Sequence, residues 1–306
     1  MQTSMKDVSS LVAALDKADY LADDRLAMAV FLALKLERPL LLEGPAGVGK
    51  TDLARAVAAA TGRGFLRLQC YEGLDESRAI YDWDYAKQIL YTQLLRDAVK
   101  ERVEGRSLAD AMEALSEANV AFFDKRFLIE RPLLKAITSE APVVLLVDEV
   151  DRADPEFEAL LLELLAERQV TIPELGTLRG PTAPLVFLTT NGTREMTDAL
   201  RRRCLHAFVD YPTPSRELAI VLRRVPGISE RLAEHLTRFV AELRDRELRK
   251  APSIAETVDW AKSIVLLGGS AIDSDAARDT LAALVKHDDD RTQAAAALDK
   301  FAKKNP

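Results

Sequence analysis

The sequence predicts an α/β fold, a parallel sheet covered by helices, followed by an all-helical subdomain. Short apolar runs that end in turns alternate with helical patterns as far as residue 212, which is typical of β-α-β units. The break Pro212-Thr213-Pro214 then interrupts the chain, and no strand pattern follows it. We therefore expect an α/β core over residues 1–212 and a helical subdomain over residues 213–306.

Composition and charge argue against several classes of protein. The 306 residues carry a net charge of -7, which does not favour nucleic acid or an anionic membrane as a partner. No stretch approaches the ~18 consecutive apolar residues of a membrane span, and the N-terminal residues lack a secretory pattern. Cys70 and Cys204 have no metal-type spacing. We expect a cytoplasmic protein with two reduced thiols.

A glycine-rich loop follows the first predicted strand. Residues 39–51 read PLLLEGPAGVGKT and match G-x-x-x-x-G-K-[ST]. Backbone N–H groups can wrap a phosphate where side chains are absent, and the next helix adds its positive N-terminus. The lysine supplies charge to the β- and γ-phosphates, and the threonine hydroxyl can bind Mg²⁺. The residues that we assign to nucleotide binding are Gly44, Pro45, Ala46, Gly47, Val48, Gly49, Lys50, Thr51 and Asp52.

Helical patterns over residues 7–18 and 23–35 precede this strand. Between them, Tyr20-Leu21-Ala22 could lie near a nucleotide base. A simple turn between two helices explains these residues equally well, so the sequence leaves both interpretations open.

A buried strand that ends in two acids supplies the second half of a nucleotide site. Pro142–Val147 is followed directly by Asp148 and Glu149. Asp148 can hold Mg²⁺ opposite Thr51, and Glu149 can polarise the attacking water. The N-K-x-D tetrapeptide that GTPases need is absent. The sequence therefore predicts an ATP hydrolase with ATP and Mg²⁺ as its cofactors.

A further buried strand, Leu185–Thr190, ends at Asn191. An amide at this place can orient the hydrolytic water, or Asn191 can simply form a turn before Gly192, and periodicity does not separate the two interpretations. Arg201, Arg202 and Arg203 form a basic run soon afterwards. Such a run is usually a solvated face, but its place in the chain makes contact with phosphate a second possibility.

Five aromatic residues gather between Tyr71 and Tyr91 in a chain that is 6% aromatic. Tyr81, Trp83 and Tyr85 alternate with acids, so an extended segment would place their three rings on one side. These rings could grip a client protein, or they could pack against a helix expected over residues 88–105. The two interpretations remain open.

The other elements follow from turn and cap residues. A β-hairpin is expected around Gly176, and a short helix over residues 196–203. The predicted C-terminal helices cover residues 215–224, 229–249, 253–267, 273–287 and 291–303.

Several of these stretches together resemble one protein family. GPAGVGKT, VVLLVDEVDRAD, LLELLAERQVTIPELG, FLTTN and ALRRRC are similar to the MoxR branch of the AAA+ ATPases. The resemblance extends over residues 20–212, and the helical tail resembles an AAA+ lid. The segment YEGLDESRAIYDWDYAKQILYTQLL is most similar to the CoxD-like subgroup, which is associated with maturation of carbon monoxide dehydrogenase.

The resemblance implies a P-loop NTPase core with a five-stranded parallel sheet and an α-helical lid, assembling as a homo-oligomeric ring, usually a hexamer. It also implies Walker A at Gly44–Thr51, Walker B at Asp148 and Glu149, and sensor 1 at Asn191. The arginine finger would be Arg202, or Arg203 one step away, supplied to the neighbouring subunit.

One departure from the family concerns the lid. MoxR-type lids carry a sensor 2 arginine in a Ser-Pro-Arg pattern, but residues 251–256 read APSIAE. Arg249 and Lys250 precede this stretch and are the candidates to replace it. The sensor 2 residue is therefore left unassigned.

The function that the resemblance implies is remodelling of a metalloenzyme during its maturation, with a von Willebrand factor A-domain protein as a partner. Two alternatives remain at this point: a nucleic-acid motor or clamp-loader-like protein, and a nucleotide-dependent scaffold with little turnover. The acidic composition disfavours nucleic acid as a partner.

Overall fold

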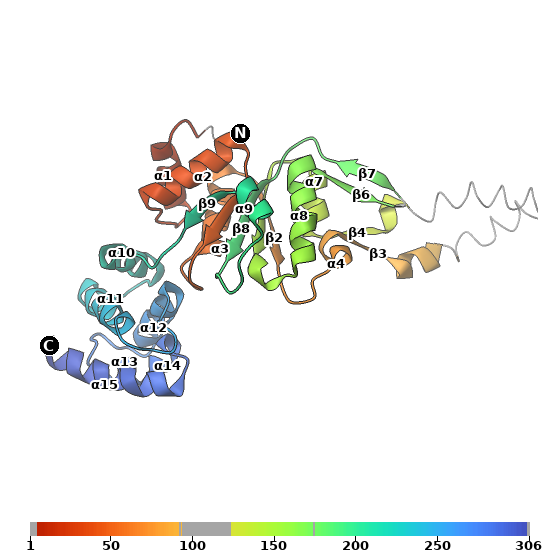
Figure 1. The fold of residues 1–306 in the computed structure, drawn as a ribbon. Coiled ribbons are helices and arrows are strands. Elements are labelled where there is room, and N and C mark those ends of the chain that lie inside the picture. The colour runs from red at the N-terminus through yellow and green to blue at the C-terminus, as the bar shows by residue number, and fades with distance from the viewer. Residues whose placement is uncertain (1–4, 92, 94–123, 174, 305–306) are drawn as a thin grey trace, which may run out of the picture.

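A computed structural model describes residues 5–91, 93, 124–173 and 175–304. Within these residues the largest sheet has five strands, all parallel, in the order β2-β5-β8-β1-β9 (Figure 1). Its strands are β1 (Leu40–Glu43), β2 (Gly64–Gln69), β5 (Val143–Asp148), β8 (Leu185–Thr190) and β9 (Leu205–Phe208). The predicted five-stranded parallel sheet is confirmed.

Each central strand is apolar on both faces, because the sheet is covered by helices on both sides. Leu40 and Leu42 pack into one apolar cluster, whereas Leu41 between them packs into the other. The first cluster also contains residues of α1 (Val8–Lys17), α2 (Asp24–Leu36) and α3 (Lys50–Thr61). The second contains residues of α7 (Pro132–Thr138), α8 (Pro155–Glu167) and α9 (Asp198–Arg203). The layers are therefore helix, sheet, helix.

Two small antiparallel sheets lie beyond β2 and β5, at the side of the core away from the C-terminal helices (Figure 1). One is the predicted hairpin, β6 (Gln169–Ile172) paired with β7 (Gly176–Arg179). The other pairs β3 (Tyr81–Trp83) with β4 (Leu128–Glu130). The short helix α4 (Glu76–Ile80) precedes β3, and the remaining short helices of the core are η1 (Lys125–Phe127) and η2 (Val150–Arg152).

The aromatic segment differs from its expected form. Trp83 is buried in the core with only 9% of its surface exposed, and its ring meets that of Tyr81 edge to face at 6.1 Å. The extended stretch ends at Trp83, because residues 85–91 are helical, and Tyr85 is exposed. The condition for three rings on one side, an extended segment, is met only as far as Trp83, because Tyr85 lies in the following helix. Most of the helix expected over residues 88–105 lies outside the described residues.

The C-terminal residues are helical, as predicted. The helices are α10 (Pro214–Arg224), α11 (Glu230–Arg244), α12 (Ile254–Leu266), α13 (Asp275–Asp279), α14 (Leu281–Leu284) and α15 (Asp288–Lys304). The single helix expected over residues 273–287 is two short helices, which meet at Thr280. Thr213, rather than Ser215, is the N-cap residue of α10.

A third apolar cluster joins these helices and contains only residues from Val221 onward. The chain between β9 and α10 is the link to the sheet (Figure 1). We propose that the boundary between core and lid lies at residues 212–213. Within the described residues, no helix has the length and apolar character needed to cross a membrane.

Candidate active site

The glycine-rich loop runs between the end of β1 and the start of α3. A Cβ on Gly44 would lie 2.0 Å from the carbonyl oxygen of Val209, the residue after β9, so only glycine fits there. Gly47 has a φ of +78°, and a Cβ on it would lie 2.3 Å from the Ser253 hydroxyl oxygen of the lid. The loop is therefore held between the core sheet and the first turn of α12, which its glycines make possible.

Lys50 is the buried cation of this loop. Its Nζ donates to the carbonyl oxygens of Gly44 and Pro45 at 2.5 and 2.8 Å and to Asn191 Oδ1 at 3.0 Å. Burial lowers the pKa of Lys50, while the carboxylates of Asp148, Asp151 and Glu149 act in the opposite direction. The ammonium group is thus placed at the mouth of the loop, next to the ends of β5 and β8.

Asp148 ends β5 and faces the first turn of α3. Its carboxylate accepts from the Thr51 hydroxyl at 3.0 and 3.2 Å and from the Thr189 hydroxyl at 2.5 Å. Carboxylate and hydroxyl oxygens are the ligands that Mg²⁺ prefers, usually with one or two protein ligands beside phosphates and water. The donor set of Thr51 and Asp148 therefore fits Mg²⁺. In the described residues, this site included, no group of three or more His, Cys, Asp or Glu side chains is placed to hold a metal.

Glu149 has a left-handed backbone with a φ of +55°. This conformation is costly for a residue other than glycine, and such outliers cluster at functional sites. Its backbone N–H donates to the Thr189 hydroxyl at 2.8 Å, and its Oε1 accepts from the Asn191 amide at 3.3 Å. Its Oε2 accepts from Gln69 at 3.0 Å and pairs with Arg152 at 2.9 Å. Groups from β2, from η2 and from the end of β8 therefore hold this carboxylate beside Asp148.

Asn191, at the end of β8, accepts from Lys50 Nζ and donates to Glu149 Oε1. Its backbone N–H donates to Asp151 Oδ2 at 3.2 Å, and this oxygen also accepts from the Thr193 amide at 3.0 Å and hydroxyl at 2.6 Å. Burial would raise the pKa of Asp151, but these hydrogen bonds outweigh it and lower the pKa. The sequence did not single out Asp151, which holds the Asn191 loop in place.

The predicted arginines lie elsewhere. Arg201, Arg202 and Arg203 are exposed on α9, and none of them is among the described residues that line the cavity beside the loop. Arg203 Nη1 donates to the Leu162 carbonyl oxygen at 2.8 Å, and the Arg202 carbonyl oxygen accepts from Arg38 at 3.0 Å. The choice between Arg202 and Arg203 as a finger for a neighbouring subunit stays a prediction.

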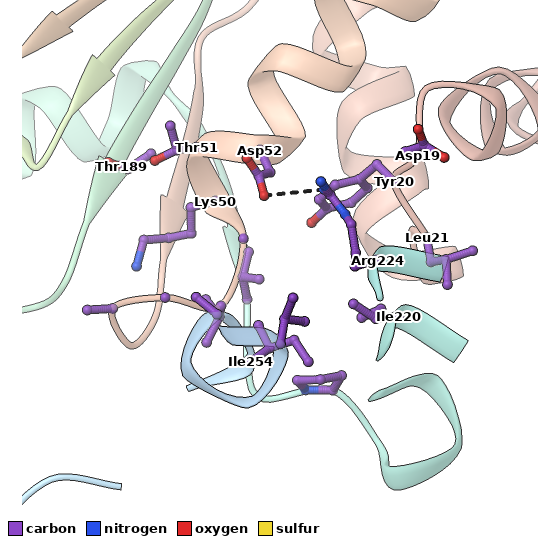
Figure 2. A pocket seen from close by; sticks show the side chains of 18 of the residues that line it. Asp19, Tyr20, Leu21, Lys50, Thr51, Asp52, Thr189, Ile220, Arg224 and Ile254 are labelled. Atoms are coloured by element: carbon purple, nitrogen blue, oxygen red, sulfur yellow. Dashed lines mark hydrogen bonds and ion pairs between the residues drawn. The ribbon is translucent and has the colours of Figure 1, made fainter. Parts of the chain in front are cut away.

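The loop, the two acids and Asn191 open into a cavity of about 410 Å³ (Figure 2). Tyr20 and Leu21 line it, so the turn between the first two helices does reach this site. The lid contributes Ile254 and Arg224, and Figure 2 shows Arg224 directed at Asp52, with its Nη2 at 3.5 Å from the Asp52 carboxylate. The lid therefore closes one wall of the cavity.

Arg249 and Lys250, the candidates for sensor 2, do not line this cavity. Their backbone N–H groups donate to Asp290, and Lys250 Nζ pairs with Glu256 at 3.2 Å. The stretch that lacks the family arginine instead meets the loop through its backbone, because the Ala255 N–H donates to the Gly47 carbonyl oxygen at 3.3 Å.

Sequence reasoning also missed Arg67 and Gln69 of β2, which bind Asp148, the last residue of β5, and Glu149, the residue after it. An arginine and a glutamine inside the otherwise apolar run FLRLQC were the available signal. Their importance depends on β2 and β5 being neighbours, which the run itself does not reveal.

Comparison with known proteins agrees with this geometry. The family model for the AAA domain (dynein-related subfamily) matches residues 39–204, more than half of the chain. No curated protein matches the chain. The matched residues include the loop, both acids, Asn191 and the arginine run. The chain therefore belongs to the dynein-related subfamily of AAA domains.

Proposed function

We propose that this AAA protein hydrolyses Mg²⁺-ATP and uses the cycle to remodel a client protein, as a member of the MoxR branch. The observation that carries the ATPase proposal is the meeting of Thr51 and Asp148 at 3.0–3.2 Å, in the cavity that Lys50 and Glu149 also line. These oxygens come from α3 and β5, two elements that the sequence separates by almost a hundred residues.

Five side chains that line the cavity have a role in this proposal. Lys50 exchanges its loop carbonyl partners for phosphate oxygens, and the loop N–H groups bind the same phosphates. Thr51 and Asp148 would hold Mg²⁺, which when bound would neutralise charge on the phosphates. Glu149 takes the proton from water as general base, and Asn191, whose amide lies 3.3 Å from Glu149 Oε1, keeps that carboxylate oriented.

The remodelling role is supported by the resemblance of residues 143–154 and 161–176 to MoxR proteins. The hairpin β6-β7, which includes part of the second stretch, projects from the core. We propose a homo-oligomeric ring, with a hexamer as its usual form, in which Arg202 completes the site of the next subunit. The CoxD-like assignment, a metalloenzyme client and a von Willebrand factor A-domain partner depend on sequence resemblance alone.

The test is steady-state ATPase activity together with nucleotide binding, using Glu149→Gln and Lys50→Ala. Glu149→Gln should bind Mg²⁺-ATP and hydrolyse it at least about a hundredfold more slowly, as expected for loss of a general base. Lys50→Ala should not bind ATP, because the phosphates lose the cation of the loop. Unchanged turnover in Glu149→Gln, or wild-type ATP affinity in Lys50→Ala, would overturn the assignment of the site.

The remodelling role is tested by trapping. Glu149→Gln, which should bind ATP and stay assembled, is used to capture the client from the native host, with Lys50→Ala as the matched negative control. The captured protein should then stimulate the wild-type ATPase. Stimulation by DNA instead would favour the nucleic-acid motor, and no stimulation by either would favour the scaffold.

A further inference from the structure

Arg67 forms an ion pair with Asp148, the carboxylate of the proposed metal site. Its Nε and Nη2 both donate to Asp148 Oδ2, at 3.0 and 2.6 Å. Nη2 also donates to the side-chain oxygen of Gln69. Arg67 lies on β2, paired in register with Leu146 of β5. The guanidinium group therefore reaches the carboxyl edge of the sheet from the neighbouring strand.

The Asp148 carboxylate is saturated by these donors. Its oxygens accept one hydrogen from Thr51, shared between both oxygens, one from Thr189 and two from Arg67. A carboxylate offers about four lone-pair sites. A cation that binds Asp148 must therefore displace a donor. Thr51 stays at the site as the other metal ligand, and Thr189 is fully buried, whereas 39% of the Arg67 side chain is exposed. Arg67 is therefore the donor that can withdraw into water.

We propose that Arg67 is a positioning residue that competes with the divalent cation for Asp148. Its guanidinium neutralises the buried carboxylate before metal and nucleotide bind, and it withdraws when the metal arrives. This inference rests on the proposed function, because it requires the metal to bind at Asp148. If Arg67 competes in this way, the affinity for the metal depends on a residue of β2 as well as on the two metal ligands.

The competition has a second consequence, for nucleotide without metal. With Mg²⁺ chelated, Arg67 is the cation nearest to Asp148 and offsets its repulsion of the phosphates. Removal of Arg67 should therefore strengthen binding of the metal and weaken binding of metal-free nucleotide. A residue that only supported the fold would not move the two affinities in opposite directions.

The experiment measures Mn²⁺ binding by the electron paramagnetic resonance signal of the free ion, with ADP saturating. Arg67→Met should bind Mn²⁺ about fivefold more tightly than wild type, the factor expected when a partly exposed ion pair no longer competes. Arg67→Lys, which keeps the charge but not the two-pronged contact, should lie between them. Binding of ADP in excess EDTA should weaken severalfold in Arg67→Met.

Arg152→Met is the matched control, because Arg152 pairs with Glu149 instead, at 2.9 Å. Its Mn²⁺ affinity should stay within about twofold of wild type. If Arg152→Met and Arg67→Met increased the Mn²⁺ affinity equally, the cause would be the loss of a positive charge near the site in general, and the proposal would be overturned. Unchanged or weaker Mn²⁺ binding in Arg67→Met, with a circular dichroism spectrum like that of wild type, would also overturn it.

Asp148→Asn separates this inference from the proposed function. If wild-type protein with ADP binds Mn²⁺ and Asp148→Asn does not, the metal site stands, and Arg67→Met alone decides the competition. If Asp148→Asn binds Mn²⁺ as wild type does, the metal does not use Asp148, and the proposed site fails together with the inference.

Discussion

A buried ion pair holds three lid helices together, and its loss should destabilise the lid severely. Glu217 of α10 is fully buried and accepts from Arg244 of α11 through both oxygens, at 2.5 and 2.8 Å. The Thr257 hydroxyl of α12 donates to the same carboxylate at 2.8 Å. Glu217→Gln removes the negative charge and leaves the guanidinium beside a neutral amide.

The size of the effect follows from how firmly Arg244 is held. Its side chain is 11% exposed, its Nε donates to the Pro252 carbonyl oxygen at 2.7 Å, and it lies 4.8 Å from the centre of the Tyr211 ring. It therefore cannot turn into water when its partner is lost. Removing one member of a buried pair costs about 3–5 kcal/mol of the free energy of unfolding.

The two tryptophans make the measurement specific to the lid. Trp260 is buried in the lid cluster and Trp83 in the core cluster. In a Trp83→Phe background, urea unfolding followed by fluorescence reports the lid alone. The midpoint should fall by about 2 M for Glu217→Gln, given a urea dependence of about 2 kcal/mol per molar. In the reciprocal Trp260→Phe background, Glu217→Gln should leave the urea midpoint of the core unchanged, if the boundary lies at residues 212–213.

Asp299→Asn is the matched control, because Asp299 forms an ion pair with Arg278 on the lid surface, where both side chains are about half exposed. It should unfold like wild type. The double variant Glu217→Met/Arg244→Met should recover much of the loss, because apolar replacements of a buried pair are often neutral. A Glu217→Gln variant as stable as Asp299→Asn would refute the reasoning, since Arg244 would then have a free route to water.

Three further predictions address the ring, the thiols and the aromatic segment. Arg202→Ala should bind ATP yet lose assembly-dependent ATPase activity by on the order of a thousandfold. Mixing Arg202→Ala with Lys50→Ala subunits should restore part of that activity. If these mixtures recover no activity but mixtures of Arg203→Ala with Lys50→Ala do, Arg203 is the finger instead. Burial raises the pKa values of Cys70 and Cys204 to about 12, so both stay protonated at pH 8 and should resist a thiol reagent until urea unfolds the protein; rapid labelling of the native protein would contradict this. Trp83→Ala should cost about 3–5 kcal/mol of stability, seen as a lower melting temperature with or without a client, whereas an unchanged melting temperature would restore the gripping hypothesis.

Local patterns were sufficient for most elements of the fold. The strand, loop and helix of residues 39–61 follow from an apolar run, glycines and a helical pattern, all of which act over a few residues. The same holds for β8, and for the helices expected to begin at residues 7 and 253. The structure shows Asp7 and Ser253 as their N-caps, which accept from the backbone three residues on at 2.8 and 3.4 Å. The split at Thr280 was missed because the helical pattern continues through it.

The place of a side chain in the site depends on strand order, which the local patterns do not contain. The acid motif predicted Asp148 and Glu149, but only the adjacency of β2 and β5 brings Arg67 and Gln69 to them. The burial of Trp83 likewise depends on the pairing of β3 with β4, far apart in the chain.

The sequence by itself thus determined the class of fold, the nucleotide loop and the two acids, because each is encoded in a continuous stretch. Only the tertiary structure decided what surrounds them: Arg67 on Asp148, Asp151 beneath Asn191, and the lid backbone at Ala255 against Gly47. These contacts join residues 40 to 208 positions apart. Periodicity reports the local geometry of the backbone, whereas such contacts arise from the packing of whole elements.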